Sequence, residues 1–329
     1  MQLMMVCASH SPLFYFPHKI SESYTAVREA VSAARERIAR FDPELVILFG
    51  GDHYGGHQMA AMPAFCVGIE ATALADVGGT PGPMRVPRQV AVDAVNALRR
   101  DDVDVAVSYA MEVDHGFSLA LDTLTGGLGT YPVLPIFVSC IQPPFVPFRR
   151  ARALGEAVGR YAVGLPYRRI LVMGTGGISH DPEFLFPTID DVSDEWRPYI
   201  LSGRRQTDVL QQSWIDYEIE AHKQAAPVLA DESVPIETYK IKEEWDKAFL
   251  NKYCTGNMSA FDNWSPSEIV ATAGIGAMET LSWVSAAAAM YTATGAKPRE
   301  MFHRPCREIG VGFGVAEAGP SEVLIRSAA

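Results

Sequence analysis

The sequence lacks the features of several common protein classes. Its five cysteines are widely spaced and never form a Cys-x-x-Cys pair, which argues against a disulfide framework or a cysteine-based zinc site. No basic stretch precedes an apolar core at the N-terminus, so we expect no signal peptide and a cytoplasmic protein. The longest uncharged helical stretch, 280–296, is too rich in Ala, Ser and Thr to span a membrane.

Positive charge and nucleotide-binding motifs are scarce as well. The chain has 28 Lys and Arg against 39 Asp and Glu, a net charge of −11, which argues against nucleic acid as a partner. It has no Gly-x-Ser-x-Gly elbow, no Gly-x-Gly-x-x-Gly and no phosphate loop ending in Lys-Ser or Lys-Thr. These absences argue against a serine hydrolase and against nucleotide binding.

Short apolar runs alternate with helical patterns through about residue 185. The runs at 3–8, 44–49, 103–110, 133–138 and 169–173 are β-branched or Leu-rich and end at Pro, Gly or Asp, as buried strands do. Helical patterns occupy 24–40, 86–100 and 148–163. The alternation predicts an α/β sandwich with a central sheet, and we expect 1–329 to form a single domain.

The character of the sequence changes over 187–262, where acidic and amphipathic segments dominate. We interpret this region as a helical excursion that provides a lid, a pocket wall or a subunit contact. The chain then returns to a buried helix at about 277–294 and an apolar strand near 310–316.

Four of the eight histidines stand in the same local setting. His10, His53, His115 and His180 each follow a predicted strand within a turn rich in Gly, Asp or Pro. Ligands bind outside the carboxyl ends of strands in open α/β sheets, so these imidazoles are expected to share one crevice. The alternative is four unrelated histidines that each cap a turn. The other four, His18, His57, His222 and His303, are expected on the surface.

Glu279 is the only charged residue in the apolar helical stretch 277–291. A buried carboxylate is costly without a cation, which here is either an arginine or a metal ion. Two histidines and one carboxylate suit Fe(II) and leave positions open for substrate and O2. Zinc accepts the same ligands, so a zinc hydrolase is an alternative. The two histidines that remain are suited to proton transfer as acid and base.

Motifs along most of the chain resemble those of the type III extradiol ring-cleavage dioxygenases, and most closely the 2,3-dihydroxyphenylpropionate 1,2-dioxygenase branch. The motifs are Ser9-His-Ser-Pro12, Ala34-Arg-Glu-Arg-Ile-Ala-Arg-Phe-Asp-Pro-Glu-Leu-Val46, Asp52-His-Tyr54, Ala106-Val-Ser-Tyr109, Val113-Asp-His-Gly-Phe117, Gly176-Gly-Ile-Ser-His180 and Glu279-Thr-Leu-Ser-Trp283. The resemblance implies an α/β sandwich around a mixed sheet, assembled as a homo-oligomer. It also implies cleavage of a substituted catechol by O2 in aromatic-compound catabolism.

The resemblance assigns roles to individual residues. It implies that His10, His53 and Glu279 bind Fe(II), and that His115 and His180 are the acid and base beside the metal. Asp52, Asp114 and Asp181 adjoin three of these histidines and either orient them or cap turns. A non-catalytic interaction protein of the Memo type, built on the same scaffold, is a further alternative.

Overall fold

The computed structural model describes residues 1–182, 185–202 and 208–320. Its main sheet is built on four parallel strands, β1 (Gln2–Ala8), β9 (Arg169–Thr175), β2 (Leu45–Gly50) and β8 (Val133–Val138). β11 (Val311–Ala318) and β10 (Arg299–Cys306) extend the sheet antiparallel beyond β1. β3 (Phe65–Gly68), antiparallel to β8, and β6 (Ala106–Ser108) complete the other edge. The sheet is therefore mixed, as expected.

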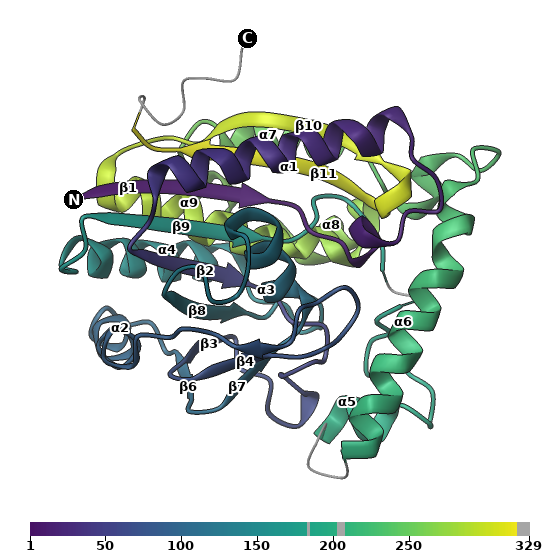
Figure 1. Ribbon diagram of the computed structural model, residues 1–329, viewed down its shortest axis with the longest axis horizontal. Helices are drawn as coiled ribbons and strands as arrows, with labels where there is room; N and C mark the ends of the chain where they lie inside the picture. Colours follow the sequence, from purple (N-terminus) through teal and green to yellow (C-terminus); the bar gives the residue numbers. More distant parts are fainter. Residues whose placement is uncertain (183–184, 203–207, 321–329) are drawn as a thin grey trace.

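Helices cover both faces of this sheet. Alternate residues of β1 belong to different cores: Met5 packs with residues of α4 (Phe148–Val163) and α9 (Thr280–Thr294), whereas Met4 packs with residues of α1 (Glu22–Phe41). In Figure 1, α1 crosses in front of the sheet, and α4 and α9 lie behind it. This arrangement confirms the α/β sandwich predicted from the alternating pattern.

The Ala-rich helix α9 is buried because α4 approaches it closely. A Cβ atom at Gly155 or Gly159 of α4 would clash with the carbonyl oxygens of Ser285 and Ala289 in α9. Small residues on both helices therefore bring the two backbones together, and the apolar stretch lies inside the protein. Among the described residues, no helix is long and apolar enough to cross a membrane.

Two predicted elements begin three residues later in the structure. Of the predicted strand 103–110, only β6 is a strand, because Val103 hydrogen-bonds Leu98 in the turn that follows α2 (Arg88–Arg100). The predicted helix 277–294 begins as a 3-10 turn, η7 (Ile275–Glu279), and α9 starts only at Thr280. Glu279 thus lies at the entrance to the helix and not within it.

The excursion over 187–262 is helical, as predicted. It contains α5 (Arg197–Ser202), α6 (Asp208–Ala230) and α7 (Glu243–Tyr253), and α8 (Pro266–Ala273) follows it. Figure 1 shows α6 standing beyond the carboxyl ends of β1, β9 and β2. The excursion is therefore placed to form a wall over the strand ends.

A second, small sheet positions the segment that precedes α3 (His115–Ala120). Its strands are β5 (Gly82–Pro83), β4 (Ala71–Ala73) and β7 (Met111–Val113), with β4 and β7 parallel. Because β4 and β7 are parallel and in register, the residues that follow each strand emerge side by side.

Candidate metal centre and catalytic pocket

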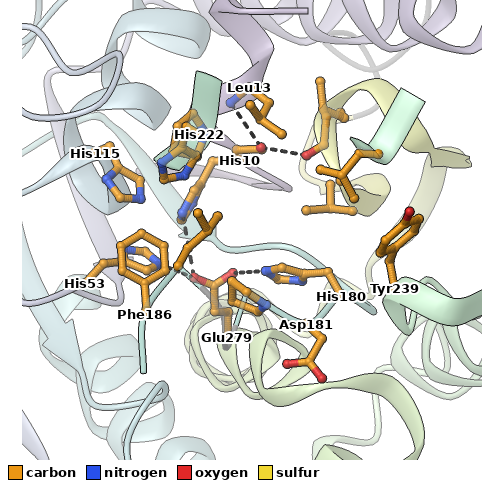
Figure 2. Close-up of a pocket in the computed structure, with 18 residues that line it drawn as sticks. His10, Leu13, His53, His115, His180, Asp181, Phe186, His222, Tyr239 and Glu279 are labelled. Carbon is orange, nitrogen blue, oxygen red and sulfur yellow. Dashed lines mark hydrogen bonds and ion pairs between the residues drawn. The ribbon is translucent and has the colours of Figure 1, made fainter. Parts of the chain in front are cut away.

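The four histidines at the strand ends line one pocket, together with Glu279 (Figure 2). His10 follows β1, His53 follows β2 and His180 follows β9, so the carboxyl ends of parallel strands bring them together. His115 reaches the same pocket from the small sheet, where it follows β7 and begins α3. The sequence had placed it after the strand predicted at 103–110.

His10 is held in place by hydrogen bonds of the serine on each side of it in the sequence. Ser11 donates to Ile309 O at 2.6 Å, and Ser9 accepts a hydrogen bond from Gly314 N at 3.0 Å. The Nδ1 atom of the ring lies 2.7 Å from Thr175 Oγ1 at the end of β9. The hydrogen bond to Nδ1 leaves Nε2, 3.7 Å from Glu279 Oε1, as the nitrogen available for a ligand.

His53 is fixed by two carboxylates. Its backbone N–H donates to Asp114 Oδ2, and its Nδ1 lies 3.5 Å from Asp114 Oδ1. Its Nε2 lies 3.0 Å from Glu279 Oε1. The ring also stacks on that of His115, with a centroid separation of 4.3 Å.

Glu279 reaches the histidines because Gly176 makes room for it and the backbone of Gly177 binds its carboxylate. A Cβ at Gly176, whose φ is +137°, would clash with Glu279 Cβ, and Gly177 N donates to Glu279 Oε2 at 2.6 Å. The glycines of the run 174–177 therefore let its backbone approach Glu279 closely. Gly176 is required there by both the lack of space for a Cβ and its positive φ. The second carboxylate oxygen also lies 3.7 Å from His180 Nε2.

His180 is enclosed by backbone on both sides. Its N–H donates to Ala273 O at 2.9 Å, and a Cβ at Gly177 or Gly276 would clash with its ring. Burial lowers the pKa of His180, so the ring is neutral and able to accept a proton.

Burial and nearby carboxylates give these histidines different charges. Burial lowers the pKa of His10 and of His115 to about 3. Burial also opposes charge on His53, but Asp114 and Glu279 outweigh it and raise the pKa of His53 above its usual value. Burial would raise the pKa of Glu279, but His10 and His53 hold it at about 2. The two carboxylates therefore stabilise positive charge at this point in the pocket.

The donor set fits a divalent cation. Nitrogen atoms of His10, His53 and His115 lie within 4.8 Å of one another, and Glu279 Oε1 contacts the first two. The Glu279 side chain is 2% exposed, and in the described part of the chain its ion pairs are with histidines alone. The arginine alternative thus has no support among the described residues. Imidazole nitrogens and a carboxylate oxygen together are suitable ligands for a transition metal.

The outer part of the pocket is mostly apolar. Its lining includes Leu13, Leu229, Ile309 and Val311. Phe186 packs against the rings of His53 and His115. Leu229 belongs to α6, so the excursion supplies part of the pocket wall.

One pocket histidine was missed from the sequence. His222 of α6 lines the pocket and is 2% exposed, although we expected it on the surface. Its Nδ1 lies 2.7 Å from the backbone oxygen of Glu218. The spacing of Trp214, Glu218, His222 and Leu229 on one buried face was the signal that could have located it.

Two other histidines were also wrongly expected on the surface. His57 is buried and stacks on Phe137 with a centroid separation of 3.8 Å. The side chain of His303 is 4% exposed, and its Nε2 lies 3.0 Å from Asp246 Oδ2. His18 is exposed, as expected.

The three aspartates beside the histidines have different partners. Asp114 contacts His53 and also caps α3 by accepting from Gly116 N at 2.8 Å. Asp52 caps its own turn by accepting from the N–H groups of Gly56 and His57. Asp181 pairs with Lys240 at 2.9 Å. The carboxylate that contacts the ring of His115 is instead Asp76, which sequence reasoning did not find.

Comparisons with known proteins identify the family of the chain. The family described as the catalytic LigB subunit of aromatic ring-opening dioxygenase matches residues 4–314. A 2,3-dihydroxyphenylpropionate/2,3-dihydroxicinnamic acid 1,2-dioxygenase from Dechloromonas aromatica is 38% identical over 98% of this chain and 99% of its own. A second from Mycolicibacterium vanbaalenii is 38% identical over 96% and 98%, and a third from Azotobacter vinelandii is 34% identical over 97% and 99%.

The solved structure of an uncharacterized protein from Escherichia coli K12 covers 95% of this chain and 98% of its own. At 12% identity and a TM-score of 0.45, that likeness is too remote to bear on function.

The chain belongs to the family of catalytic LigB subunits of aromatic ring-opening dioxygenases. It is an oxidoreductase of the extradiol type, which opens an aromatic ring with O2.

Proposed function

We propose that this dioxygenase binds Fe(II) through His10, His53 and Glu279 and cleaves a substituted catechol beside its two hydroxyl groups. The observation that carries this proposal is the buried Glu279 carboxylate, whose described ionic partners are imidazoles. Imidazoles can release their protons to solvent when a metal ion binds, whereas an arginine would have stayed charged as the permanent partner. Fe(II) in this position supplies a Lewis acid and a redox centre for the catechol and O2.

We assign proton transfer to the two remaining histidines. His180 accepts a proton from a catechol hydroxyl, because burial keeps its ring neutral. His115 donates a hydrogen bond and then a proton to the reacting oxygen, through the ring nitrogen that faces the pocket. Phe186, packed against His53 and His115, limits the access of water to these rings.

The substrate is a catechol whose substituent lies against the apolar wall. Leu13, Leu229, Ile309 and Val311 offer contact to a propionate chain, an aryl group or another ring substituent. The relatives named above make 2,3-dihydroxyphenylpropionate the first compound to test. We further propose that 1–329 acts as one catalytic domain within a homo-oligomer, which light scattering after size exclusion tests.

The metal is tested by purification without air. We expect about one Fe(II) per chain, loss of activity on exposure to air or peroxide, and recovery with Fe(II) and ascorbate. Zn(II) added to the same metal-free protein is the matched control. Full activity with stoichiometric zinc and no iron would contradict the proposal and favour a zinc enzyme.

The substrate is tested by an anaerobic panel of catechols. The panel contains 2,3-dihydroxyphenylpropionate, a biaryl catechol, a gallate-like ring and unsubstituted catechol. Air is then admitted, and O2 uptake and the yellow ring-opened product are measured. No ring opening with any member by the iron-loaded enzyme would contradict the proposed substrate class.

A further inference from the structure

Asp76 and His115 are brought together by the small sheet. Ala73 of β4 pairs with Val113 of β7, and Leu74 N donates to Val113 O at 2.9 Å. Asp76 lies three residues beyond β4 and His115 two residues beyond β7. The parallel pairing therefore places the carboxylate and the imidazole side by side.

The contact between them is short and made at two points. Asp76 Oδ2 lies 2.6 Å from His115 Nδ1 and accepts from the His115 backbone N–H at 2.8 Å. Both side chains are almost completely buried, with exposed fractions of 2% and 1%. Gly79 makes room for the carboxylate, because a Cβ there would clash with Asp76 Oδ1.

We propose that Asp76 is a positioning residue for proton transfer by His115. When His115 is the donor, the Asp76–His115 pair holds two protons, one between Oδ2 and Nδ1 and one on Nε2. The first stays in the contact with Asp76, so the ring exchanges protons with the substrate only through Nε2. The second hydrogen bond, to the backbone of His115, fixes the ring relative to its own main chain. Asp76 itself does not touch the pocket, since it is absent from the residues that line it.

The position of His115 explains why such a clamp is needed. Its ring stacks on His53, which we propose as a metal ligand, at a centroid separation of 4.3 Å. A ring free to turn about χ2 could direct either nitrogen toward the metal. With Nδ1 held by Asp76, the ring keeps one orientation and remains beside the metal as a proton donor.

The inference rests on the proposed role of His115, and a double-mutant cycle tests it. In the iron-loaded enzyme, Asp76→Ala should lower kcat about 10–100-fold, the range usual for loss of an orienting partner. Iron per chain and KM for the catechol should stay within about twofold. Asp76→Asn should lose less, because its amide oxygen can still accept from both N–H groups.

The same Asp76→Ala change should cost nothing further in a His115→Gln protein, since the side chain that it orients is gone. Single turnovers followed over hours make slow variants measurable. An equal fold-loss of kcat in both backgrounds, loss of iron, or unchanged kcat in Asp76→Ala would overturn the proposal.

A second readout does not depend on activity. In the metal-free protein, the proton between Asp76 and His115 should give an exchange-protected, low-field proton resonance. We expect it to disappear in Asp76→Ala and in His115→Gln and to persist in Asp76→Asn. If the wild type shows this resonance but the iron-loaded enzyme opens no catechol, the proposed function fails while the contact stands. If ring opening depends on His115 but the resonance survives Asp76→Ala, the role of Asp76 is refuted.

Discussion

Glu279→Gln tests the metal site, and Glu317→Gln is its matched control. Both glutamates are buried and both have nitrogen partners. Glu317 of β11 accepts from Arg37 of α1 at 2.6–2.9 Å, and neither residue lines the pocket. Glu279 has imidazole partners at 3.0–3.7 Å. The two changes remove the same charge from two kinds of partner.

The cost of each change depends on whether the partner can become neutral. Arg37 stays charged, so Glu317→Gln leaves a buried cation and should cost about 3–5 kcal/mol. At about 2.1 cal/mol/K of unfolding entropy per residue, the 329-residue chain loses about 4–7 °C in Tm. His53 can release its proton, so Glu279→Gln should cost the metal-free protein only about 1–3 kcal/mol.

Iron affects the two variants in the opposite order, because Glu279→Gln loses the stabilisation that bound iron provides and Glu317→Gln keeps it. With free Fe(II) at about 100 times Kd, binding stabilises the wild type by about 2.7 kcal/mol, or about 4 °C in Tm. A 100-fold weaker site would keep about 0.4 kcal/mol, less than about 1 °C. Glu317→Gln should show the full iron-dependent shift from a lower starting Tm.

The assay measures iron per chain, Tm with and without Fe(II), and ring opening for all three proteins. We expect Glu279→Gln to lose iron and ring cleavage, and Glu317→Gln to lose stability alone. An iron-replete, active but heat-labile Glu279→Gln protein would refute the reasoning and mean that the third ligand lies elsewhere.

Two further predictions concern the histidines of the pocket. His115→Gln and His180→Gln should retain iron while kcat falls about 10²–10⁴-fold, and a variant that arrives metal-free would instead be a ligand. His222→Leu should raise KM about 2–10-fold for catechols whose substituent donates a hydrogen bond. This range corresponds to the loss of one hydrogen bond of about 0.5–1.5 kcal/mol. The KM for unsubstituted catechol should be unaffected, and His18→Leu, at an exposed position, is the control. An equal rise in KM with every catechol would contradict this role for His222.

The reason for the His222 prediction is its tautomer. The Glu218 backbone oxygen can only accept, so the proton of the ring lies on Nδ1, and burial lowers the pKa of His222 to about 3. The neutral ring therefore presents Nε2 to the pocket as an acceptor. An acceptor at this position favours a substituent that donates a hydrogen bond.

The strand-end part of the pocket could be predicted because it follows from chain direction. A buried parallel strand such as β1 or β2 has a continuous apolar signal, and the residue after its end must emerge at the carboxyl edge of the sheet. Glu279 was identifiable because a lone charge in an apolar stretch requires a cation. These arguments use only the local sequence and one rule of sheet topology.

The second layer of the pocket could not be predicted in the same way. β4 and β7 have three residues each, too few for a periodic pattern, and their pairing joins segments about 40 residues apart. The contact between Asp76 and His115 exists only because of that pairing. The partner of His53 was likewise unpredictable. Asp114 is adjacent in sequence to His115, but its carboxylate contacts the ring of His53.

Rigid and variable parts of the pocket come from different segments of the chain. The hydroxyls of Ser9 and Ser11 hydrogen-bond backbone atoms and so hold His10, and Gly177 N holds Glu279. We expect a substitution beside His10 or Glu279 to shift the side chains that hold the metal. The wall provided by Leu229 and His222 is carried by one helix outside the main sheet, and its side chains can change without moving a strand. We therefore expect substitutions at the strand ends to act mainly on kcat, and those on the pocket face of α6 to act mainly on KM and on the choice of ring substituent.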